Sequence, residues 1–192
     1  MNEIYNAANF YYEEDNNKDQ KVNDFINQYK LKTYDFFIKK ERIITQKNKK
    51  RRVYFYEKDT FEDIMCSHFS FVLSKKFKIK YNDRNKIIKE LINCLQLIKN
   101  INDFTIIRFD FKDYFNSISS SYIFEKYLKN ADISRELLNI MKEFFEANKN
   151  CSAGFPTSNL MAELISKDFD VELKANLSKY GVVNQQYGQI KN

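Results

Sequence analysis

The chain has 192 residues, of which 43% are hydrophobic and 30% are charged, and its formal net charge is +6. This composition excludes a broadly disordered chain and supports the core of one domain, or of one domain with an appendage. The positive charge suits a polyanionic partner such as nucleic acid, although ordinary soluble proteins also carry it.

The cysteines and the single histidine argue against several classes of site. Cys66, Cys94 and Cys151 are far apart and no Cys-x-x-Cys pair exists, so neither a disulfide framework nor a zinc site is expected. His68 is the only histidine, which argues against histidine-centred catalysis. The first residues lack an apolar signal core, and no stretch is long enough to span a bilayer. We therefore expect a protein of the reducing cytoplasm that does not contact a membrane.

Residues 1–45 predict a helical or loose N-terminal arm. Residues 1–23 are polar and poorly patterned and favour a loose arm with one short helix. Residues 24–45 mix aromatic residues and isoleucines with lysines, which favours one or two helices.

A basic run at 46–52 passes directly into residues 53–56, whose β-branched and aromatic side chains favour a strand. Arg51 and Arg52 close the basic run. They lie either in a solvated loop or on a strand that presents their guanidinium groups to phosphates.

Two helices are expected next. Thr60 and Asp63 form a capping-box pattern before an apolar stripe, and His68 lies on or beside that stripe, as expected for a histidine at the edge of the core. A second helix covers residues 82–100, which Asn82 or Asp83 can cap, and Ile87, Leu91, Leu95 and Ile98 form its apolar stripe. Arg84 stands at its entry, either in solvent or in contact with a phosphate or ribose group.

Residues 103–111, "DFTIIRFDF", predict a strand that places Asp110 near its end. Further helices are expected after the serines at 119–121, over 133–147 and over 159–178. The order strand, helix, helix, strand indicates a mixed α/β or α+β domain. No glycine-rich phosphate loop precedes a helix, so P-loop and dinucleotide-binding folds are not expected.

Four segments, in order over residues 50–183, together resemble the reverse transcriptase family. "IIRFDFKDYFNSI" is similar to its first catalytic motif and "CSAGFPTSNLMAELI" to the motif that follows. Upstream, "KKRRVYFYEKDTFEDIMCSHFSFVL" and "YNDRNKIIKEL" resemble two elements of the fingers region. The fit is to the bacterial forms found in retrons, group II introns and abortive-infection or other phage-defence systems.

The resemblance implies an α+β fold that is a partial right-hand polymerase, with fingers and the first part of the palm but no thumb. In this scheme residues 1–45 are the N-terminal arm, 46–100 the fingers-like region and 101–192 the partial palm. It also implies cytoplasmic RNA-templated DNA synthesis by two-metal nucleotidyl transfer. The partners would be an RNA template, a DNA primer or product, and dNTPs.

The resemblance also assigns roles to single residues. Asp110 and the backbone carbonyl of Phe111 would bind Mg²⁺, which prefers hard oxygen ligands. Phe115 would pack under the incoming sugar, and Arg51, Arg52 and Arg84 would lie near the nucleotide phosphates. The residues expected to lie against the template are Gly154, Pro156, Thr157 and Ser158. Without the resemblance, Asp110 could cap a turn, Phe115 could belong to the core, and the proline turn could simply begin a helix.

Two departures from the family pattern bear on activity. Ser152 and Ala153 stand before Gly154 where the family reads Pro-Gln-Gly, so a glutamine that would contact the nucleotide is missing. The family's later aromatic-x-Asp-Asp motif is also missing, because Gln189 and Ile190 follow Gly188 and no acidic residue follows Glu172.

One carboxylate cannot hold two Mg²⁺ ions, so the sequence predicts an incomplete polymerase: a truncated or frameshifted product, a degenerate subunit, or a split enzyme whose second chain supplies the remaining palm and thumb. The alternative is a non-catalytic subunit on the same fold that binds nucleic acid or serves in assembly. A third interpretation, a helical protein–protein module with an accidental match, predicts no nucleic-acid binding.

Overall fold

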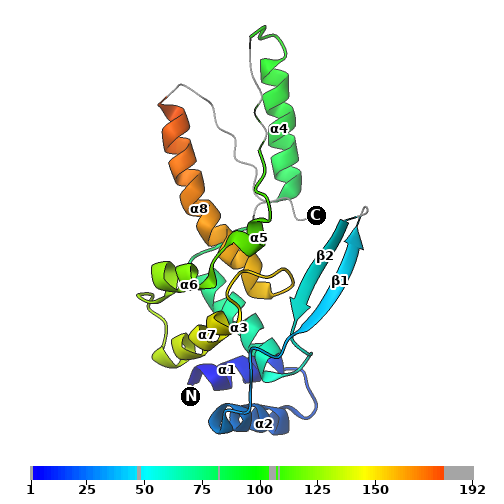
Figure 1. Cartoon of the computed structure of the whole chain (residues 1–192), viewed down its shortest axis with the longest axis vertical. Helices are drawn as coiled ribbons and strands as arrows, with labels where there is room; N and C mark the ends of the chain where they lie inside the picture. The colour runs from blue at the N-terminus through cyan, green and yellow to red at the C-terminus, as the bar shows by residue number, and fades with distance from the viewer. Residues whose placement is uncertain (1, 47–48, 82, 104–106, 108, 180–192) are drawn as a thin grey trace.

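The computed structural model describes residues 2–46, 49–81, 83–103, 107 and 109–179, which form a mostly helical α+β structure (Figure 1). In this part of the chain there are eight helices, one π-helical turn and one antiparallel hairpin. They are α1 (Asn2–Tyr11), α2 (Lys18–Leu31), β1 (Lys40–Gln46), β2 (Lys49–Phe55), α3 (Phe61–Lys76), α4 (Arg84–Ile98), α5 (Tyr114–Ser117), α6 (Ser120–Ile123), the π-helical turn Phe124–Leu128, α7 (Arg135–Ala147) and α8 (Pro156–Ser178). None of these helices is both long and apolar enough to cross a bilayer.

Helix α3 forms the centre of the core. It packs against α8, α1 and α2, and Phe61, Met65, Phe69 and Leu73 along it are fully buried. Phe144 of α7 approaches Phe69 with a ring-centroid distance of 5.7 Å. Burial of such large apolar side chains supplies most of the driving force for folding.

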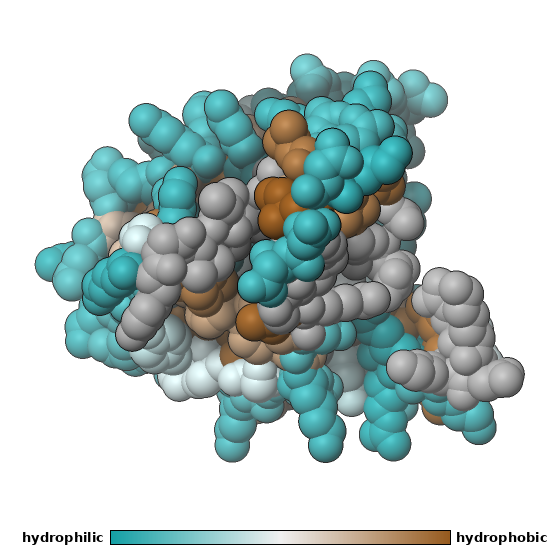
Figure 2. Space-filling view, turned by 90° about the horizontal axis from the view of Figure 1, so that it is seen from above, coloured by the Kyte–Doolittle hydropathy of each residue, from teal (hydrophilic) through white to brown (hydrophobic). Residues whose placement is uncertain are grey.

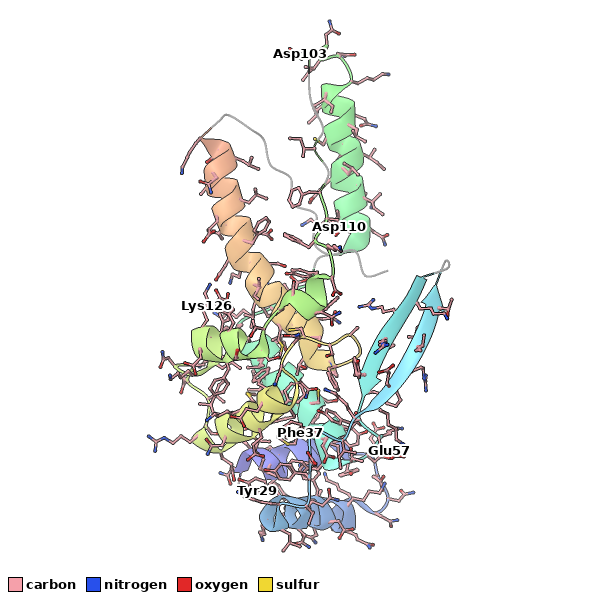
Figure 3. All side chains as sticks on the ribbon, viewed as in Figure 1. Tyr29, Phe37, Glu57, Asp103, Asp110 and Lys126 are labelled. Carbon is pink, nitrogen blue, oxygen red and sulfur yellow. The ribbon has the colours of Figure 1, made fainter. Side chains whose placement is uncertain are left out.

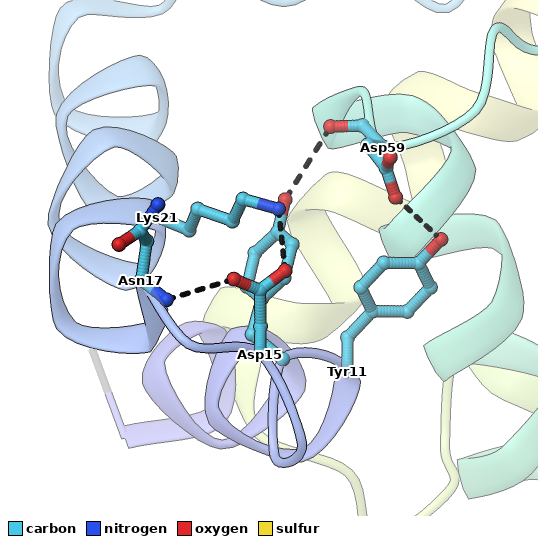
Figure 4. Close-up of polar contacts among 6 residues, drawn as sticks. Tyr11, Asp15, Asn17, Lys21 and Asp59 are labelled. Atoms are coloured by element: carbon cyan, nitrogen blue, oxygen red, sulfur yellow. Dashed lines mark hydrogen bonds and ion pairs between the residues drawn. The ribbon is translucent and has the colours of Figure 1, made fainter.

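The N-terminal segment is not a loose arm, so this part of the expectation was wrong. Ala7 and Ala8 are buried in α1, and small side chains allow a helix to approach its neighbours closely. The Tyr11 hydroxyl donates a hydrogen bond to Asp59, just before α3, and Lys21 of α2 pairs with Asp15 (Figure 4). A single-sequence pattern does not reveal the docking of Tyr11 on Asp59, because these two residues are 48 positions apart.

Strand β1 occupies residues for which a helix was predicted. It pairs with β2 in an antiparallel register that places Ile43 opposite Arg52 and Ile44 opposite Arg51. The β-branched Ile43 and Ile44 fit a pleated strand, and β2 supplies the hydrogen-bonding partner that the sequence pattern could not show. The predicted strand at 53–56 is confirmed in β2 apart from Tyr56, which follows its end.

The capping signals for two helices are confirmed. The Thr60 hydroxyl accepts a hydrogen bond from the backbone N–H of Asp63, and the Asp83 carboxylate accepts one from Asn85 N–H at 2.8 Å. Each satisfies a backbone donor that the first helical turn leaves unpaired. Helix α8 starts at Pro156, three residues earlier than predicted, because proline is well accommodated in the first helical turn.

The described residues of the predicted strand at 103–111 are not in a strand. Residues 104–106 and 108 lie outside the described part, whereas Ile107, Phe109 and Asp110 have irregular backbone. Within the described residues no neighbouring strand pairs with this segment. Phe109 and Phe111 instead contact Phe169 of α8, at ring-centroid distances of 6.3 and 5.2 Å.

Helix α4 and the C-terminal half of α8 extend away from the body on the same side (Figure 1). The predicted apolar stripe of α4 is present, but Ile88, Leu91 and Leu95 are exposed. Seen from above, hydrophobic residues reach the surface between hydrophilic ones (Figure 2).

Candidate functional site

The hairpin strand β2 is docked on the turn that precedes α8. The backbone N–H of Tyr54 donates to the carbonyl of Ala153 at 2.8 Å. Gly154 has φ of +111°, and a Cβ atom there would lie 2.2 Å from the Tyr54 carbonyl oxygen and 2.9 Å from Val53 Cγ1. Only glycine allows both this backbone conformation and this close approach. The basic strand and the Gly-x-Pro turn, about 100 residues apart in sequence, therefore form one unit.

The hydroxyl groups of Thr157 and Ser158 were expected to be exposed for template binding, and this detail was wrong. Both side chains are buried. Ser158 Oγ donates to the Ser152 carbonyl oxygen at 2.5 Å, which closes the turn onto the first turn of α8. Thr157 Oγ1 lies 3.9 Å from Sγ of Cys66, where burial raises the pKa of the thiol to about 12.

Two residues of the turn face solvent. Gly154 and Pro156 are exposed, whereas the intervening Phe155 is buried and stacks on Tyr56 at a ring-centroid distance of 5.0 Å. Pro156 lacks a backbone N–H, so it offers only apolar surface and a carbonyl, which accepts a hydrogen bond from Ser70 Oγ at 3.3 Å. The buried side chain of Phe155 therefore attaches the turn to the hydrophobic core.

Arg51 and Phe115, both predicted site residues, are brought into contact. The guanidinium carbon of Arg51 lies 5.5 Å from the centroid of the Phe115 ring. This distance is within the range of a cation–π interaction. Arg51 is exposed and Phe115 is half-buried, so the ring shields one side of the guanidinium and leaves the other side to solvent.

The short helix α5 holds Phe115 in place. The neighbouring hydroxyl of Tyr114 donates to the carbonyl of Ala162 at 3.0 Å and lies 2.6 Å from Ser166 Oγ, so it ties α5 to α8. Burial raises the pKa of Tyr114 above its usual value, and the phenol therefore stays neutral at physiological pH. Tyr114 and Phe115 are both half-buried and pack against the core, and the Tyr114 hydroxyl forms the link to α8.

Arg52 is separated from Arg51 by the alternation of the strand. It projects on the opposite face of the hairpin, is well exposed, and its Nε lies 3.7 Å from Glu41 Oε1. Arg84 is the first residue of α4, and its side chain lies outside the described part of the structure. The three predicted arginines therefore do not form one described cluster, and Arg51 alone meets another predicted site residue.

Sequence reasoning missed two residues that share a hairpin face with Arg51. Arg42 lies with its guanidinium carbon 5.4 Å from the ring centroid of Phe55, and the register places both on the Arg51 face. The run of β-branched residues Ile43, Ile44 and Thr45 was the available signal for a strand, but this segment was assigned to a helix. Residues 40–55 contain seven lysines and arginines and one glutamate, so the hairpin is strongly basic.

Asp110 lies on the segment that leads into α5, near the base of α4 (Figure 3). Its carboxylate is exposed, and Oδ1 accepts a hydrogen bond from the backbone N–H of Phe111 at 2.9 Å. Only Oδ1 accepts this hydrogen bond, so the exposed carboxylate can still bind a cation through Oδ2.

The residues of the described part do not by themselves fit a pair of Mg²⁺ ions. Across 2–46, 49–81, 83–103, 107 and 109–179 there is no group of three or more His, Cys, Asp or Glu side chains that could hold a metal ion. Two adjacent divalent ions need several carboxylate oxygens to offset their repulsion. Asp110 and the Phe111 carbonyl could contribute to such a centre only together with further acidic ligands.

No family model matches the sequence, and no curated protein and no solved structure matches the chain. The likeness to reverse transcriptases thus depends on the sequence motifs alone. The coarse class that the structure defines is a mostly helical α+β protein with one basic hairpin.

Proposed function

We propose that this chain is a reverse-transcriptase-type protein whose basic hairpin and Gly154 turn bind nucleic acid. In this proposal the chain comprises fingers and the first part of a palm, and it works in the cytoplasm of a bacterial phage-defence or retron system. One observation carries the proposal: the Arg51 guanidinium carbon lies 5.5 Å from the centroid of the Phe115 ring, so the basic strand meets the aromatic residue expected at the nucleotide sugar.

Charge and shape support nucleic acid as the partner. The hairpin is exposed and basic, and Arg42, Phe55, Arg51 and Phe115 alternate cationic and aromatic groups. Cations neutralise phosphates and aromatic rings stack on bases, so this alternation suits an unpaired strand such as an RNA template. The docking of β2 on the Gly154 turn positions the cations before a partner binds, which reduces the ordering cost of binding.

DNA synthesis is the more specific part of the proposal, and it requires further metal-binding carboxylates besides Asp110. Asp110 would supply one Mg²⁺ ligand, and Phe115 would contact the sugar of the dNTP, but the remaining carboxylates would have to come from outside residues 1–192. A chain without them would still bind template and primer. The non-catalytic alternative, a nucleic-acid-binding or assembly subunit on the same fold, is favoured by the lack of a metal-binding cluster among the described side chains.

Fluorescence anisotropy with a labelled single-stranded RNA tests the binding site. We expect affinity to fall steeply with salt and to drop by about tenfold or more in the double variant Arg42→Gln/Arg51→Gln, because two cations on one face are lost. The matched control is Lys129→Gln/Lys142→Gln, which removes two cations from i,i+4 surface pairs elsewhere. Equal loss in both double variants would show that only net charge matters and would refute the site.

A primer-extension assay with Mg²⁺ and dNTPs separates the catalytic from the non-catalytic form. For this chain alone we expect RNA binding without synthesis. Synthesis that disappears in Asp110→Asn would overturn the non-catalytic alternative and show that the chain supplies a complete metal site. Loss of RNA binding in the same variant would instead indicate that Asp110 supports the fold of the segment.

A further inference from the structure

A cavity of about 400 Å³ lies between the turn that follows α3 and one face of α8. Residues 77–80 form one wall, and the other wall consists of residues on successive turns of α8, from Glu163 to Lys174. Its volume is in the range of small-molecule sites. None of the residues assigned to the candidate nucleic-acid site lines it.

Four lysines line this cavity: Lys78 and Lys80 from the turn, and Lys167 and Lys174 from α8. Lys167 and Lys174 are seven residues apart, so they lie on the same face of the helix, two turns apart. Across the described residues none of the four forms an ion pair within 4.0 Å. Other surface lysines, such as Lys126 with Asp168 at 2.8 Å, do form such pairs.

The turn that carries Lys78 and Lys80 is held by the end of α3. Phe77 N–H donates to Leu73 O and Ile79 N–H donates to Ser74 O, both at 2.9 Å. Lys78 has φ of +50°, the left-handed conformation with which many helices end. The position of the turn is therefore set by backbone hydrogen bonds, and Lys78 and Lys80 are carried on a defined backbone.

The charges in the cavity favour an anion. Glu163 and Asp170 also line it, so four lysines against two carboxylates leave a formal excess of two positive charges. Phe77, Ile79 and Val171 add apolar surface. A ligand with a doubly charged end and an apolar or aromatic part would match both features.

We propose that this cavity binds a phosphate group attached to a small apolar or aromatic moiety. The phosphate could belong to a free phosphomonoester or to the 5′ end of a nucleic-acid strand, since the same lysines would recognise both. This inference does not depend on the proposed function of the hairpin. Its failure would leave RNA binding on the Arg51 face untouched.

Isothermal titration calorimetry with phenyl phosphate, in a phosphate-free buffer of low ionic strength, tests the cavity directly. We expect phenyl phosphate to bind, inorganic phosphate to bind more weakly, and phenol not to bind. The variant Lys167→Gln/Lys174→Gln should weaken phenyl phosphate binding by about tenfold or more, because two charge-assisted contacts are lost. The matched control Lys129→Gln/Lys142→Gln should bind as the parent protein does.

A further variant, Val171→Ser, probes the apolar wall. Val171 is exposed on α8, so the change should leave the fold intact. We expect it to weaken phenyl phosphate binding and leave inorganic phosphate binding unchanged.

The two sources of the phosphate are distinguished by comparing 5′-phosphorylated and 5′-hydroxyl oligonucleotides in the Arg42→Gln/Arg51→Gln background. A preference for the phosphorylated strand supports a nucleic-acid end, and no preference supports a free phosphomonoester.

Three results would overturn the proposal. They are no binding of phenyl phosphate, binding of phenol as tight as that of phenyl phosphate, and an equal loss of affinity in the control double variant and the cavity variant. The first two exclude recognition of phosphate, and the third shows attraction by net charge alone.

Discussion

Replacement of Gly154 by alanine tests the contact that holds the basic hairpin on the body of the protein. In the parent chain Gly154 has φ of +111°, and its Cα packs against the backbone of Tyr54. Alanine would place its Cβ 2.2 Å from the Tyr54 carbonyl oxygen, so the turn must either move or accept a severe clash.

Two costs add up in the variant. A non-glycine residue in a rarely populated positive-φ conformation costs about 1–3 kcal/mol. Overpacking against neighbours that cannot retreat costs about 1–3 kcal/mol more. If the turn moves away instead, the hydrogen bond from Tyr54 N–H to Ala153 O is lost, together with the packing of Val53. We therefore expect the free energy of unfolding to fall by about 2–6 kcal/mol.

Urea unfolding followed by circular dichroism measures the global effect, and amide hydrogen exchange at Tyr54 reports local undocking. Ser152→Ala is the matched control, because it adds no atom to the same turn and its hydroxyl makes only a 3.5 Å contact with Asn150 O. A Gly154→Ala protein within about 0.5 kcal/mol of the parent, with Tyr54 exchange unchanged, would refute the packing argument.

Three further variants test single contacts by urea unfolding. Thr60→Ala removes the N-cap of α3 and should cost about 1 kcal/mol, whereas Thr60→Ser should cost less. Ser158→Ala removes the hydrogen bond that closes the turn before α8 and should cost about 1 kcal/mol; no loss would mean that the bond contributes nothing. Burial lowers the pKa of His68, so the neutral imidazole contributes stability above its ordinary pKa of 6.5. This contribution is lost as pH falls through the lowered pKa. His68→Gln should therefore flatten the pH dependence of the free energy of unfolding.

The helices were largely predictable because their signals are local. Thr60 caps α3 and Asp83 caps α4 as expected, and both caps act within three residues along the chain. The exposed stripe of α4 has the predicted helical period, although the pattern could not show that most of it stays uncovered in this structure. Strand β1 was missed because a strand depends on its partner, and the register with β2 is a contact between different segments.

The candidate site was predictable in composition but not in arrangement. Arg51, Phe115 and Gly154 were each picked out from the sequence, and the structure brings the first two to 5.5 Å and packs the third against β2. Thr157 and Ser158 were expected to reach solvent, yet both are buried. Their direction depends on how α8 meets α3 and the preceding turn, and no local pattern contains that information.

By itself the sequence determined the charge of the hairpin, the helix caps and the residue types of the candidate site, because these follow from composition and from neighbours a few positions away. Only the tertiary structure decided that α1 and α2 dock on the core, that Arg51 rather than Arg52 meets Phe115, and that four lysines gather around one cavity. Those outcomes depend on contacts between segments far apart in the chain, where close packing selects one arrangement from many that the local pattern allows.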